Sequence, residues 1–130
     1  MSVTVDYWFT PQSPWTYLGH ERFARLLAQS GAGVRVLPVD YGRIFPASGG
    51  LPLPKRAPQR QAYRLVELAR WSRHLGVPMN VQPRFFPVDG TAASLLITAV
   101  AERDGAASAM ALTGGIMTAC WAGERDIADS

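Results

Sequence analysis

Residues 9–19 read Phe-Thr-Pro-Gln-Ser-Pro-Trp-Thr-Tyr-Leu-Gly, and this stretch decides the fold. Before it, apolar residues recur at every second position over residues 3–9, which predicts a strand. After it, an amphipathic run over residues 14–29 predicts a helix. Ser13 and Pro14 stand at the junction in the order that commonly begins a helix, a capping residue followed by proline. We therefore expect the Ser13 hydroxyl to lie at the positive N-terminal end of that helix.

The rest of the chain predicts one more strand and three more helices. A break at residues 30–33 is followed by a strand over residues 34–41, which gives a parallel β-α-β unit with a right-handed crossover. Residues 42–58 are rich in glycine and proline and predict a long loop, of the kind that is usually functional or mobile. Helices are expected over residues 59–75, 91–103 and 106–122, with an irregular connection over residues 80–89.

The turn at Ser13 resembles that of a known family. A strand that leads into Ser-Pro-aromatic-Thr-aromatic-Leu-Gly resembles the active-site turn of thioredoxin-like proteins, with serine in place of the first cysteine. More closely, it resembles the 2-hydroxychromene-2-carboxylate isomerases and the related kappa-class glutathione transferases, within the wider group that includes DsbA-type disulfide oxidoreductases. Further segments match this family in their order and spacing: Pro58-x-Arg60-x-x-Tyr63 followed by Glu67 and Arg70, Gly76-Val77-Pro78, Phe86-Pro87, and Trp121 to Ile127.

The resemblance implies an α/β, thioredoxin-like fold with a β-α-β start and an inserted α-helical region. Residues 1–45 would form the N-terminal β-α-β part, and residues 46–130 the Pro/Gly-rich loop and the helical insertion. Family members continue beyond the position of Ser130, so we expect the C-terminal strands and helix of the thioredoxin fold to be missing from this chain. The missing part would include a Val-Pro loop that presents backbone groups to glutathione in the family. A fragment and a natural short form both fit this expectation.

The resemblance also implies a function, that of a glutathione-dependent isomerase of the 2-hydroxychromene-2-carboxylate isomerase type. Ser13 would stabilise the glutathione thiolate at the helix N-terminus, where thiol pKa values are lowered. The thiolate would add to an unsaturated aromatic carboxylate, allow rotation about a bond that is now single, and leave again. Two alternatives stay open: a kappa-type glutathione S-transferase, and a non-catalytic thioredoxin-like remnant that binds a partner. A different low-molecular-weight thiol and a homodimer also stay open.

Candidate glutathione-binding and substrate-binding residues follow from the resemblance and from side-chain chemistry. They are Ser13, Pro14, Trp15, Arg43, Phe45, Lys55, Arg56, Phe86 and Pro87. The basic members are expected to hold the substrate carboxylate, because a guanidinium can donate two parallel hydrogen bonds to it. Residues 50–56 depart from the Asn-Lys-Pro-Pro-like run that these isomerases often carry, so the polar asparagine is absent here. No metal site is predicted.

Composition is that of one soluble globular domain. The 130 residues are 48% hydrophobic and 18% charged, which is enough chain for one core. There is no apolar run of membrane-spanning length and no secretory signal pattern, so we expect a cytoplasmic protein with no membrane partner. The single cysteine, Cys120, excludes an internal disulfide and a Cys-x-x-Cys redox pair, and we expect its thiol to be buried and inert.

Two further functions are disfavoured by the charged residues. The net charge of +3 is small, and without a recognition motif we expect no nucleic-acid partner. The cations between residues 55 and 74 are expected mostly on the outward faces of a helix. Neither His20 nor His74 is placed to activate Ser13 as the nucleophile of a serine hydrolase.

Overall fold

The N-terminal part of the chain, through Pro38, forms a parallel β-α-β unit. The structure, a computed structural model, describes residues 2–129. Strand β1 (Thr4–Phe9) leads into helix α1 (Pro14–Ser30) and then into strand β2 (Gly33–Pro38). The two strands pair in parallel, as the sequence predicts.

Local chemistry fixes both ends of α1. At its start, Ser13 has extended backbone angles, and its Oγ accepts a hydrogen bond from the Thr16 N–H at 3.2 Å. At its end, Gly31 adopts the left-handed conformation with φ 70°, and its N–H donates to the Leu27 carbonyl. Glycine takes this conformation without the steric cost that a Cβ would add. The helix therefore begins and ends where the sequence predicts, to within one residue.

The region predicted as a long loop contains two short helices, so that prediction is wrong. Helix α2 spans Tyr41–Ser48, and a 3₁₀ helix, η1, spans Leu53–Lys55. The preceding strand ends at Pro38 instead of continuing to Tyr41. Asp40 caps α2, because its Oδ1 accepts from the Gly42 N–H at 2.8 Å. Such a cap satisfies an N–H group that the helix itself leaves unpaired.

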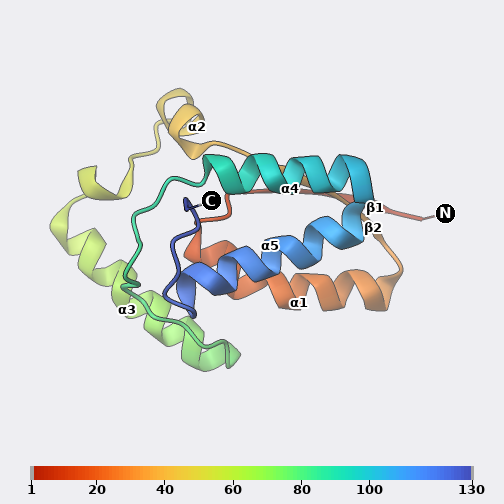
Figure 1. The fold of residues 1–130 in the computed structure, drawn as a ribbon. Coiled ribbons are helices and arrows are strands. Elements are labelled where there is room, and N and C mark those ends of the chain that lie inside the picture. Colours follow the sequence, from red (N-terminus) through yellow and green to blue (C-terminus); the bar gives the residue numbers. More distant parts are fainter. Residues whose placement is uncertain (1, 130) are drawn as a thin grey trace.

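Three long helices complete the described part of the chain. They are α3 (Pro58–Leu75), α4 (Thr91–Asp104) and α5 (Ala106–Trp121), each within one or two residues of its predicted bounds. In Figure 1, α4 and α5 run antiparallel, and α5 lies along α1. Helix α3 lies to one side of these three helices (Figure 1). Helix α4 packs on α5 and β2, and α1 packs on α5 and α3. The boundary predicted between residues 45 and 46 falls within α2 and stays a prediction.

The core has two parts. The first joins the strands to α4 and α5 through Phe9, Val36, Ile97, Ala109 and Met110. The second joins the first turn of α1 to the end of α5 through Tyr17, Met117, Cys120 and Trp121. Both parts are held by burial of apolar surface, at roughly 25 cal/mol per Å². The spacing of Met110, Met117 and Trp121 indicates packing residues, and burial of all three confirms it.

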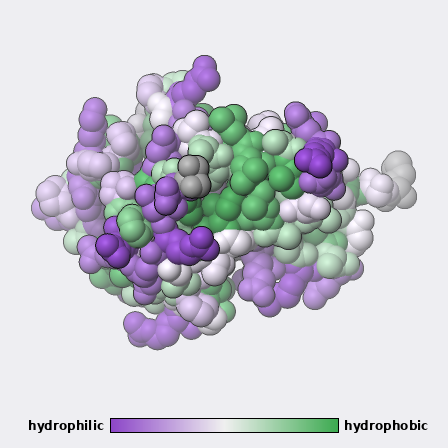
Figure 2. All heavy atoms as spheres, in the orientation of Figure 1, coloured by the Kyte–Doolittle hydropathy of each residue, from purple (hydrophilic) through white to green (hydrophobic). Residues whose placement is uncertain are grey.

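The fold buries Cys120 and leaves apolar surface on one face (Figure 2). Burial raises the pKa of the Cys120 thiol to about 11, which confirms the expected buried cysteine and makes it a poor nucleophile. Figure 2 shows apolar surface in the middle of one face, over α4 and α5. On α4, Leu95 and Leu96 are exposed. Among residues 2–129, no helix combines the length and the apolar character needed to cross a membrane.

Candidate functional site

The candidate site is built around the start of α1. Strand β1 ends at the buried Phe9, and the chain turns through Thr10 and Pro11, which are also buried. The backbone N–H of Ser13 donates to the Thr10 carbonyl at 3.1 Å and closes this turn. Since the turn is anchored in the core, Ser13 has little freedom to move relative to the sheet.

The Ser13 hydroxyl accepts a hydrogen bond but does not donate one within residues 2–129. The hydroxyl oxygen accepts from the Thr16 N–H, and the backbone carbonyl of Ser13 accepts from the Tyr17 N–H at 3.1 Å. Among the described residues, the Ser13 O–H donates to no acceptor. A hydroxyl can donate one hydrogen bond while it accepts others, so its proton is available to a ligand. The helix N-terminus adds a partial positive charge that favours an anion at this position.

A cavity of about 480 Å³ opens beside Ser13. It is formed where α1, α2, α3 and the segments after η1 and α3 meet. The structure brings most of the predicted site residues to it: Ser13, Pro14, Trp15, Phe45, Arg56, Phe86 and Pro87. The lining therefore combines hydroxyl groups, aromatic and proline surface, and guanidinium charge, which suits a partly apolar anion.

Arg43 and Lys55 are not among the residues that line this cavity. Arg43 lines another cavity, of about 280 Å³, that is also lined by Asp89. Lys55 is exposed at the end of η1. Of the three cations predicted to hold a carboxylate, Arg56 alone reaches the Ser13 cavity.

Sequence reasoning missed Tyr41, Gln61 and Arg64, which also line the cavity. Tyr41 was expected in a strand, but it begins α2 and stacks on Phe45 with ring centroids 5.1 Å apart. The cations between residues 55 and 74 are mostly exposed, as the sequence predicts, and the half-buried Arg64 is an exception. Its guanidinium carbon lies 5.4 Å from the centroid of the Phe86 ring. The spacing of Gln61, Arg64 and the buried Leu68 along α3 is the signal that could have placed them on one face.

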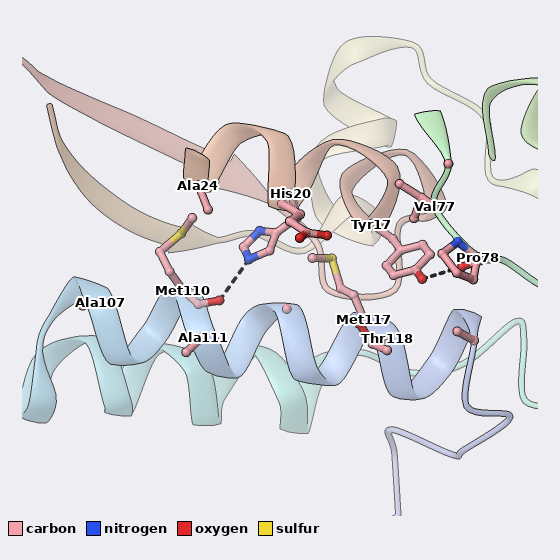
Figure 3. Close-up of a pocket in the computed structure, with 14 residues that line it drawn as sticks. Tyr17, His20, Ala24, Val77, Pro78, Ala107, Met110, Ala111, Met117 and Thr118 are labelled. Carbon is pink, nitrogen blue, oxygen red and sulfur yellow. Dashed lines mark hydrogen bonds between the residues drawn. The ribbon is translucent and has the colours of Figure 1, made fainter. Parts of the chain in front are cut away.

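A larger cavity, of about 640 Å³, lies between α1 and α5 (Figure 3). His20 lines it, but both ring nitrogens are already bonded, one to the Tyr7 hydroxyl and the other to the Met110 carbonyl, each at 2.9 Å. Burial lowers the pKa of His20 below its ordinary value. The Tyr17 hydroxyl donates to the Pro78 carbonyl at 2.5 Å. His20 is therefore a structural residue that holds α1 to β1 and α5, so the smaller cavity is the candidate site.

Comparison with known proteins assigns the family. A model described as the DSBA-like thioredoxin domain matches residues 4–130, so the chain belongs to that family. This confirms the predicted thioredoxin-like α/β class with its β-α-β start and helical region.

Named relatives agree with the predicted resemblance. Glutathione S-transferase kappa 1 of Caenorhabditis elegans is 29% identical over 82 residues, which cover 62% of this chain and 36% of the relative. The 2-hydroxychromene-2-carboxylate isomerase of Pseudomonas putida is 30% identical over 78 residues, which cover 59% of this chain and 38% of the relative. A solved structure of a selenomethionine 2-hydroxychromene-2-carboxylate isomerase gives a TM-score of 0.74 at 25% identity, over 98% of this chain and 60% of that one. The matched segments thus span well under half of the two curated relatives, and the chain spans 60% of the solved structure.

Proposed function

We propose that the protein is a glutathione-dependent isomerase of the 2-hydroxychromene-2-carboxylate isomerase type. The observation that carries the proposal is the Ser13 hydroxyl, which caps α1 and faces an aromatic-lined cavity with its proton free. The similarity to isomerases of that name supports the reaction class. Glutathione would supply a nucleophilic sulfur that the chain itself lacks, since its cysteine is buried.

The residues around Ser13 fit a thiolate. The O–H of Ser13 would donate to the sulfur, and the α1 N-terminus would lower the thiol pKa. This is stabilisation of an anion by fixed donors, in which the Ser13 oxygen does not itself attack. Phe45 and Phe86 would lie against the aromatic part of the substrate, and the rings would exclude water from it.

The first test replaces Ser13 in the full-length gene product. Ser13→Ala should lower kcat for 2-hydroxychromene-2-carboxylate by about 100-fold, as expected for loss of one donor to a developing or bound anion. It should also raise the pKa of bound glutathione, followed by thiolate ultraviolet absorbance. Loss of the cap will cost about 1 kcal/mol of stability, so activity and urea unfolding are measured on the same sample.

Ser13→Asp separates the two roles. Aspartate caps a helix as well as serine does, but it cannot donate to a thiolate and repels one. We therefore expect normal stability with activity as low as in Ser13→Ala. Full activity in either variant would show that the Ser13 hydroxyl has no part in the reaction.

A kappa-type glutathione transferase is the second candidate, favoured by the similarity to the nematode protein of that name. It would use the same Ser13 site and differ in releasing a conjugate. Conversion of 1-chloro-2,4-dinitrobenzene with no isomerisation of 2-hydroxychromene-2-carboxylate would favour this candidate.

A further inference from the structure

Two arginines, Arg56 and Arg64, line the edge of the Ser13 cavity. Arg56 follows η1, and Arg64 lies in the second turn of α3. Both line the Ser13 cavity, and both also line a neighbouring cavity of about 440 Å³ that contains Arg60 and Tyr63. Together with Trp15, they form the boundary that the two cavities share.

Neither arginine has an acidic partner among residues 2–129. The ion pairs within residues 2–129 join Asp6, Glu67 and Asp104 to other arginines. Glu67 is the acidic residue that lines the neighbouring cavity, and its carboxylate already accepts from Tyr63, Arg70 and Trp71. Arg56 uses its Nε to donate to the Leu51 carbonyl at 2.9 Å, which leaves its terminal nitrogens free.

The two positive charges are close enough to disfavour each other. Arg64 is half-buried, and burial together with the charge of Arg56 lowers its pKa. Its contact with the Phe86 ring offsets part of this cost, because a cation is attracted to an aromatic face. An anion between the two guanidinium groups would offset the repulsion between their charges and accept hydrogen bonds from their free N–H groups.

We infer that Arg56 and Arg64 form a carboxylate-binding subsite of the Ser13 cavity. The ligand is an organic acid whose carboxylate lies between the two guanidinium groups and whose apolar part lies against Phe86. This assigns to Arg64 the role that the sequence suggested for Arg43 and Lys55. The inference rests on the proposed function only in taking the Ser13 cavity as the binding site. The carboxylate belongs to the aromatic substrate or to the glycyl end of glutathione, and both sources present the same group.

Matched acid and amide ligands test the subsite. Calorimetric titration of the full-length gene product would use cinnamate against cinnamamide, and glutathione against its glycine amide. Arg64→Gln should weaken binding of at least one of the two acids by about tenfold or more, and leave both amides unchanged. Weaker binding of cinnamate assigns the subsite to the substrate, and weaker binding of glutathione assigns it to the glycyl carboxylate of glutathione.

Arg60→Gln is the matched control, because Arg60 is an exposed arginine one turn earlier on α3 and does not line the Ser13 cavity. It should bind all four ligands as the parent protein does. Arg56→Gln should repeat the loss seen for Arg64→Gln, and Arg64→Lys should retain part of the acid affinity. These two variants serve if Arg64→Gln does not fold.

The possible outcomes test the carboxylate subsite independently of the proposed isomerase activity. Unchanged acid binding in Arg64→Gln and Arg56→Gln, or an equal loss for acids and amides, overturns the subsite whatever the enzyme activity. Selective loss of acid binding supports it, even in a protein that does not isomerise 2-hydroxychromene-2-carboxylate and so contradicts the proposed function.

Discussion

His20 carries a pH-dependent part of the stability. In the folded protein its ring is buried and bonded to Tyr7 and Met110, so its pKa lies below the ordinary value of 6.5. The unfolded chain then binds a proton more readily than the folded one as pH falls below about 6.5. The contribution of His20 is therefore complete above that pH and declines as pH falls toward the folded-state pKa.

The paired variants His20→Gln and His74→Gln test this at the residue scale. We expect urea unfolding to show a smaller loss of stability between neutral and mildly acidic pH in His20→Gln than in the parent protein. His74 is exposed on α3, so His74→Gln should keep the parent's pH dependence. An unchanged profile in His20→Gln would assign the acid sensitivity to other groups.

At the scale of the elements, the long regular segments were predictable and the short ones were not. The strands and α1, α3, α4 and α5 follow from hydrophobic period and from residues that start and stop helices. Helix α2 was missed because Gly42, Pro46 and Gly49 give the composition of a loop. Its cap at Asp40 and the contact between Tyr41 and Phe45 outweigh that composition.

The site was predictable where it depends on a local motif. Ser13, Pro14 and Trp15 belong to one turn, so the motif predicts that they lie together, and all three line the same cavity. Arg64 depends on which face of α3 turns toward Phe86, and that follows from how two distant segments pack. Charge and position in a predicted loop point to Arg43 and Lys55 as well, but α2 and η1 form in that region and neither residue lines the Ser13 cavity.

Helix α2 offers a test of its own, because it brings Tyr41 and Phe45 to the cavity. Asp40→Ala should remove its cap, cost about 1 kcal/mol, and weaken cinnamate binding by loosening the cavity wall. Asp40→Asn keeps a capping side chain and should restore both properties. If Asp40→Ala binds cinnamate like the parent protein, the wall does not depend on this cap.

At the scale of the whole molecule, the two-stranded sheet is the feature that favours association between chains. Strands β1 and β2 pair with each other, and within residues 2–129 neither has a second strand beside it. The side chain of Trp8, on the outer side of β1, is 61% exposed. Unpaired strand edges and exposed apolar side chains favour association between chains.

We therefore expect this chain to self-associate as its concentration rises, measured by sedimentation velocity. Trp8→Lys should reduce the association, because charge on a strand disfavours pairing between chains. Trp71→Lys changes an exposed tryptophan on α3 and should have no such effect. A sedimentation coefficient independent of concentration would show that the exposed edges are harmless in this chain.

The cap at Ser13 has a consequence for the entropy of binding. A free hydroxyl rotates, and a ligand that needs its proton must stop that rotation. Here the bond from the Thr16 N–H already fixes where the oxygen lone pairs point, and so restricts where the proton can lie. Helix formation therefore already restricts the rotation of the Ser13 hydroxyl, so a ligand that binds there loses less entropy in ordering it.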